Sequence, residues 1–125
     1  MATIKNHTDI EQSRKLAKFL SHESADMWYW EWPTAPRYNN YERPMPHKGE
    51  DIVNVPCWSL SALLSVLPKY IGSSILRMDI GEKDFAIWYD NLSGIVDEIL
   101  PDITKDNPVD ACYEMICRLK ENNMI

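Results

Sequence analysis

The C-terminal segment 106–120 carries a full set of helix signals. Asn107 suits the N-cap, Pro108 suits the first helical position, and Asp110 places a negative charge in the first turn. An apolar stripe recurs at three- and four-residue spacing: Val109, Cys112, Ile116 and Leu119. We therefore expect a helix over about 108–121 that buries one face against another element. No residue pattern in this segment indicates a catalytic site.

Composition indicates one ordinary globular unit. The 125 residues are 45% apolar and carry a formal net charge of −6, so we expect a single domain over 1–125 that has its own core. The negative charge and the lack of a Lys/Arg run disfavour nucleic-acid binding. The longest apolar run, 60–67, is too short to span a bilayer, and the N-terminus has no apolar signal region. We expect a cytoplasmic protein that does not enter a membrane.

Two further helices are predicted. The first covers about 9–20, with Thr8 as the N-cap and Glu11 completing a capping box. The second covers about 59–67, is capped by Ser59 and is ended by Pro68. Its apolar stripe is Leu60, Leu63, Leu64 and Leu67. Because only serines are polar in it, we expect this to be the most buried helix.

A β-hairpin is predicted over about 75–89. Alternation places Leu76, Met78 and Ile80 on one face, where they can match Phe85, Ile87 and Tyr89 across the turn 81–84. The other face of the hairpin is expected to be exposed to solvent. The segment 91–104 is open between a short helix, which Gly94 and Pro101 would limit, and a third strand. The expected fold class is α+β, with a small antiparallel sheet built on this hairpin and packed against three main helices.

An aromatic segment precedes these elements. Residues 27–32 read as a strand with its tryptophans on one face, 33–49 as a long proline-rich loop, and 52–55 as a short extended piece. Aromatic and Arg side chains are enriched at binding hot spots. The candidate partner-binding residues are Trp28, Trp30, Trp32, Arg37, Tyr38, Tyr41 and Arg43. The alternative is that one face of the tryptophans fills the core.

The three cysteines do not form a site in the sequence. Cys112 and Cys117 lie about 140° apart around a helix and cannot share a metal, so we expect Cys57 and both of these to be buried, unpaired thiols. No phosphate-binding glycine loop and no zinc-ligand spacing occurs, so we expect no metal and no cofactor. A catalytic alternative remains: a small hydrolase or transferase in which Cys57, near a helix start, works with His22 or His47.

Three motifs carry a resemblance. They are Ala25-Asp26-Met27, the run from Val55-Pro56-Cys57-Trp58-Ser59 to Leu67-Pro68, and Asn107-Pro108-Val109 through Ile116. With them the chain resembles a group of small uncharacterised proteins carried by prophages and other mobile elements of gut bacteria. The resemblance covers most of the chain after residue 12, and 33–49 and 91–105 match least. It transfers no catalytic residue, and it implies a cytoplasmic accessory protein of a mobile element.

We therefore expect a non-enzymatic accessory or protein-interaction domain. The aromatic segment suits either a protein partner or self-association, and the sequence does not choose between them.

Overall fold

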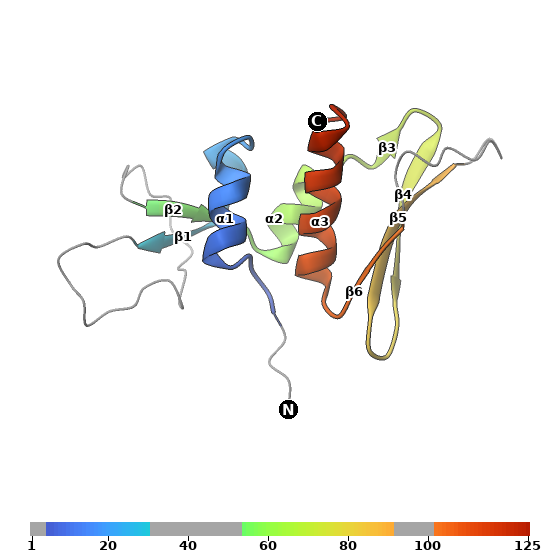
Figure 1. Cartoon of the computed structure of the whole chain (residues 1–125), viewed down its shortest axis with the longest axis horizontal. Coiled ribbons are helices and arrows are strands. Elements are labelled where there is room, and N and C mark those ends of the chain that lie inside the picture. The colour runs from blue at the N-terminus through green and yellow to red at the C-terminus, as the bar shows by residue number, and fades with distance from the viewer. Residues whose placement is uncertain (1–4, 31–53, 92–101) are drawn as a thin grey trace.

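The computed structural model describes residues 5–30, 54–91 and 102–125. In chain order the elements are α1 (Ile10–Ala17), the short 3-10 helix η1 (His22–Ser24), β1 (Met27–Trp30), β2 (Asn54–Cys57), α2 (Leu60–Val66), β3 (Tyr70–Ile71), β4 (Ser74–Ile80), β5 (Phe85–Asn91), β6 (Ile103–Lys105) and α3 (Pro108–Glu121). Figure 1 shows two small antiparallel sheets at opposite ends, with the three α-helices between them. The predicted α+β class is confirmed.

Helix α3 is the centre of the core. Asn107 caps it by accepting the Asp110 N–H at 2.9 Å, and Pro108 occupies the first helical position, as predicted. Its buried residues are Val109, Ala111, Cys112, Met115, Ile116, Cys117 and Leu119. The helix packs against α2 on one side and against β5 and β6 on another.

The expectation that the 59–67 helix is the most buried is wrong. Ser59 does cap α2, by accepting the Ala62 N–H at 3.2 Å, but within the helix only Ala62 and Leu63 are buried. The reason is position in the fold, because α3 has neighbours on two sides whereas α2 exposes Ser61 and Ser65 to solvent.

Helix α1 begins one residue later than its capping pattern predicts. Asp9, not Thr8, is the N-cap: its carboxylate accepts the Gln12 N–H at 2.8 Å, and Gln12 Oε1 accepts the Asp9 N–H at 3.1 Å. Thr8 is unavailable because its buried hydroxyl bonds to Ser13 Oγ at 2.7 Å. The helix also ends at Ala17, short of the predicted residue 20.

The larger sheet has the order β3-β4-β5-β6 and contains the predicted hairpin. The cross-strand pairs are Leu76 with Tyr89, Met78 with Ile87 and Ile80 with Phe85, which confirms the register. Strand β6 pairs with β5 at its Phe85 end. Residues 92–101 lie outside the described residues, so the choice between helix and strand for that segment stays open.

The smaller sheet pairs β1 with β2, from Met27 opposite Cys57 to Trp30 opposite Asn54. Strand β2 continues through Pro56, beyond the short extended piece expected at 52–55. A proline fits there because both strands of a two-stranded sheet have an open edge, where a missing N–H breaks no ladder. The predicted loop 33–49 lies outside the described residues.

Candidate functional site

The residues predicted to bind a partner lie on and after β1. Trp28 is 7% exposed, and its ring meets the His22 ring edge-on with 5.9 Å between centroids. For this residue the burial agrees with the alternative that the tryptophan face fills the interior. Trp30 ends β1, but its side chain is outside the described residues. Wholly outside them are Trp32, Arg37, Tyr38, Tyr41 and Arg43. The partner-binding role of this segment therefore stays a prediction.

Tyr29, the next residue of β1, is buried more deeply than Trp28. Its side chain is 1% exposed, its hydroxyl donates to the Thr8 carbonyl at 2.7 Å, and it lies 3.3 Å from His7 Nδ1. Burial is the main cause that raises the pKa of this hydroxyl, so it stays protonated and keeps its donor role. The hydrogen bond from Tyr29 to Thr8 thus holds the segment before α1 against the smaller sheet.

The Cys57 thiol contacts the same buried carbonyl, that of Thr8. Its thiol donates to Thr8 O at 3.4 Å and lies 3.6 Å from Thr8 Oγ1, and the residue is fully buried. Burial raises the pKa of the Cys57 thiol, although its hydrogen bonds to Thr8 and Ser13 act in the opposite direction. A nucleophilic cysteine needs a thiolate that a substrate can reach. The observed surroundings favour a packing role for this thiol.

The other two thiols have similar surroundings. Cys112 and Cys117 are buried and unpaired, as is Cys57, which confirms the prediction for all three. Burial raises the pKa of Cys112 to about 12. Among the residues that the structure describes, no three His, Cys, Asp or Glu side chains gather into a group that could hold a metal ion.

Two of the motifs behind the resemblance meet in space. Asp26 accepts hydrogen bonds from the Ser59 N–H, at 2.9 Å, and from the Ser59 hydroxyl. The indole N–H of the fully buried Trp58 donates to Ser24 Oγ at 2.9 Å. Met27 faces Cys57 in the sheet. These residues therefore join η1 and β1 to the start of α2, which is a structural role.

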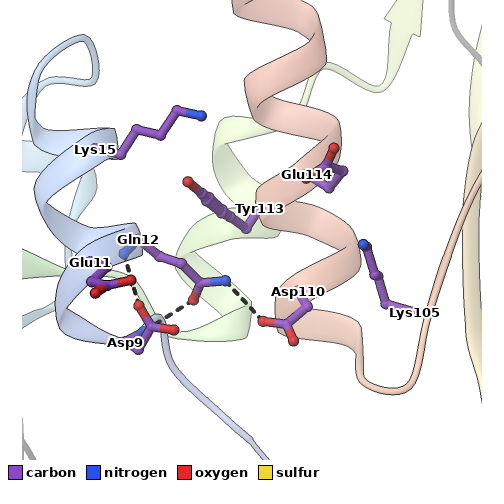
Figure 2. Close-up of a pocket in the computed structure, with 8 residues that line it drawn as sticks. All are labelled: Asp9, Glu11, Gln12, Lys15, Lys105, Asp110, Tyr113 and Glu114. Carbon is purple, nitrogen blue, oxygen red and sulfur yellow. Dashed lines mark hydrogen bonds between the residues drawn. The ribbon is translucent and has the colours of Figure 1, made fainter.

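A polar cleft of about 500 Å³ lies between α1 and α3. Figure 2 shows Gln12 reaching from α1 to Asp110 at the start of α3, with Nε2 donating to Oδ1 at 2.9 Å. Farther along, Lys15 Nζ lies 5.9 Å from the centre of the Tyr113 ring. The remaining lining side chains are charged: Asp9, Glu11, Lys105 and Glu114. Both signs of charge are present, and the contacts between its walls tie the two helices together.

Two residues that line this cleft, Asp9 and Asp110, form a charge network with Lys5. Lys5 Nζ lies 2.7 Å from Asp110 Oδ1 and 3.2 Å from Asp9 Oδ2. Burial alone would raise the pKa of Asp110, but hydrogen bonds from Lys5, Asn107 and Gln12 outweigh it and hold the pKa below its usual value. Burial likewise opposes the charge of Lys5, but its contacts with Asp110 and Asp9 raise the pKa of the ammonium. The network stabilises the junction of the two helix starts.

The outer part of β4 carries two exposed apolar side chains, Met78 and Ile80. Residues Arg77–Ile80, here called the β4 edge, are all exposed, with Met78 at 45% and Ile80 at 80%. Their partners across the hairpin, Ile87 and Phe85, are buried. The apolar face of the hairpin is therefore covered on β5 and at Leu76 of β4, but it is uncovered at the outer end of β4.

A second cleft, of about 630 Å³, begins at this edge. Its apolar wall is formed by Leu60, Ile80, Phe85 and Pro108, and its rim carries Lys5, Glu82, Lys83, Asp84 and Asp106. The cleft lies where the β4–β5 turn approaches the starts of α2 and α3, so it extends the exposed apolar surface of the β4 edge toward the helices.

The alternation of residues predicts that Met78 and Ile80 lie on the packed face of the hairpin, but both side chains are exposed. The alternation of residues carried no signal of this exposure, because it depends on which strands of the four-stranded sheet a helix covers, and α3 packs on β5 and β6.

Comparisons of the chain with protein-family models, with curated proteins and with solved structures give no match. No helix in the described part of the chain is long and apolar enough to cross a membrane.

Proposed function

We propose that this protein is a non-enzymatic interaction domain that binds another polypeptide. The observation that carries the proposal is the β4 edge, where Met78 and Ile80 remain exposed although their cross-strand partners are buried. Exposed apolar side chains that are contiguous on a strand edge favour contact with another chain.

The state of the buried nucleophiles supports the non-enzymatic part of the proposal. The Cys57 thiol lies in the interior, and its pKa is raised mainly by burial, so its neutral form is favoured at pH 7. The Tyr29 hydroxyl next to it is held as a hydrogen-bond donor. Both groups are used in packing the segment before α1 against the smaller sheet.

The resemblance to proteins of prophages and mobile elements supports the setting. We infer that the domain is an accessory protein of such an element and acts in the cytoplasm. The contacts of Asp26 with Ser59, and of Asn107 with Asp110, suggest that the shared motifs specify a common fold rather than a reaction.

The aromatic segment is a second surface in this proposal. Trp28 contributes to packing, so contact with a partner falls to the residues after it, of which Tyr38 and Tyr41 are the strongest candidates because tyrosine is enriched at hot spots. Losing a central aromatic anchor commonly costs about 2 kcal/mol or more of binding free energy.

Affinity capture from the native host, followed by mass spectrometry, tests the function. The bait proteins are the wild type, Met78→Lys, the double variant Tyr38→Ala/Tyr41→Ala, and Ile125→Lys as the control. Ile125 is an exposed apolar residue away from the β4 edge, so its variant makes a matched change of charge. We expect one or more proteins that the wild type and the control retain and that a surface variant loses. Identical capture by all four proteins, or by none, would contradict the proposal.

A further inference from the structure

We propose that the β4 edge pairs with the β4 edge of a second copy of this chain, forming a two-fold symmetric, antiparallel continuation of the sheet. This inference rests on the proposed interaction function and names the partner of one surface.

The backbone groups of Met78 and Ile80 point to the side of β4 that faces away from β5. Leu76 N–H donates to the Lys69 carbonyl at 2.9 Å, on the side of the strand that faces β3. Backbone groups alternate sides along a strand, so the N–H and C=O of Met78 and Ile80 point to the same side. Strand β3 pairs only with Ser74 and Ile75. Within the described residues no strand pairs with Met78 or Ile80 on that side.

The length of the open interval on β4 determines the register in which two copies can pair. Lys69 and β3 occupy the edge up to Leu76, and the turn at Gly81 ends the strand, so an incoming strand has only Arg77–Ile80 available. An antiparallel copy fits this interval when the two-fold axis passes beside Asp79. In that register Met78 of each copy lies opposite Ile80 of the other, and their N–H and C=O groups bond to one another.

The apolar side chains of Met78 and Ile80 match those of a second copy, which favours self-pairing over pairing with an unrelated strand. On one face the exposed Met78 and Ile80 side chains cover each other across the axis. On the other face Asp79 lies directly opposite Asp79 of the other copy, a like-charge pair that weakens the contact. Arg77, diagonally across, already binds Asp90 of its own chain, with 2.9 Å between Nε and Oδ2. The short interval is therefore self-complementary in its apolar residues, Met78 and Ile80.

The contact is small, so the pairing is weak. Interfaces well below the standard size belong to transient complexes, and we expect a dissociation constant on the order of 0.1 mM. Sedimentation velocity of the full chain should show a monomer at low concentration and a growing dimer fraction over about a hundredfold rise in concentration around that value.

Two charge variants test the register. In Met78→Lys each introduced lysine faces Ile80 of the other copy, and in Ile80→Glu each introduced glutamate faces Met78, so each variant alone should dimerise about tenfold more weakly. Mixed in equal amounts, the two variants place the introduced lysine opposite the introduced glutamate in one pair and leave Ile80 opposite Met78 in the other. The mixture should therefore recover dimer. Ile125→Lys is the control and should dimerise as the wild type does. Unchanged thermal midpoints show that the variants fold.

The outcomes separate this inference from the proposed function. Concentration-dependent dimer that forms about tenfold more weakly in each variant and is recovered in the mixture supports the self-pairing. A wild type that stays monomeric at every concentration overturns the self-pairing. If that monomer still captures a host protein in a Met78-dependent way, the interaction function stands and the edge binds another polypeptide. Single variants that both dimerise as tightly as the wild type also overturn the proposed pairing.

Discussion

The two sheets of this protein differ in how their apolar side chains are covered. In the β1–β2 sheet Trp28, Tyr29, Val55 and Cys57 are all buried, on both faces of the strands. In the β4–β5 hairpin the apolar face is buried on β5 but exposed on β4 at Met78 and Ile80. The strands of the smaller sheet are therefore covered, whereas the larger sheet has one strand, β4, whose outer apolar residues are exposed.

The difference follows from what lies against each sheet. Helix α1 packs on β2, and the segment before α1 adds the Thr8 carbonyl that binds Tyr29 and Cys57. The larger sheet has α3 over β5 and β6, so β4 lies beyond the helix. A pattern of alternation predicts a strand, but the number of covering elements determines which strands are buried.

The largest expected effect compares two isoleucines on one face of the hairpin. Ile87→Ala should lower the free energy of unfolding by about 2–5 kcal/mol, because Ile87 is fully buried and truncation leaves a cavity. Ile80→Ala should lower it by less than about 1 kcal/mol, because Ile80 is mostly exposed. Denaturant unfolding measures both values. Equal losses would mean that β4 and β5 are covered alike.

A smaller effect is expected at the junction beside the covered sheet. Asp26→Ala should lower the free energy of unfolding by about 1 kcal/mol, because two hydrogen bonds to Ser59 are lost while the freed groups can still meet water. Asp102→Ala, at an exposed position, is the matched control and should change little. If the two variants unfold at the same denaturant concentration, the contact between Asp26 and Ser59 is not stabilising.

The smallest effect is electrostatic and appears only in acid. The pKa of Asp110 is lower in the folded protein than its usual value of 3.8, so its charge stabilises the fold above that pH and the stabilisation is lost as pH falls below it. Because the carboxylate is partly exposed, we expect less than about 1 kcal/mol. Unfolding free energies of the wild type and Asp110→Asn, measured from neutral pH to acid, should converge at low pH. A constant difference would contradict the role of the charge.

Local signals predicted most of the elements. Helix α3 follows its cap, its first-position proline and its apolar stripe, and the hairpin register follows the alternation of Leu76, Met78 and Ile80. The N-cap of α1 was missed because Thr8 and Asp9 both suit a cap, and only the fold shows that the Thr8 hydroxyl is used in the interior.

The candidate site was harder to predict, because exposure depends on contacts between distant segments. Tyr29 lies on the strand face opposite the predicted tryptophan face, yet it is buried, and its hydroxyl binds the Thr8 carbonyl from the segment before α1. Met78 and Ile80 were placed on the packed face, yet α3 does not extend over them. A single sequence gives the face of each residue, and it does not give what covers that face.

Amide hydrogen exchange along β4 tests the central claim most directly, namely that the β4 edge is open in the monomer and available to a partner. In dilute protein, the Met78 and Ile80 amides should exchange much faster than those of Arg77 and Asp79, which face β5. In concentrated protein, the Met78 and Ile80 amides should slow, while the other two change little. If the Met78 and Ile80 amides are already as protected as their neighbours in dilute protein, the edge is covered within the chain and the account is wrong.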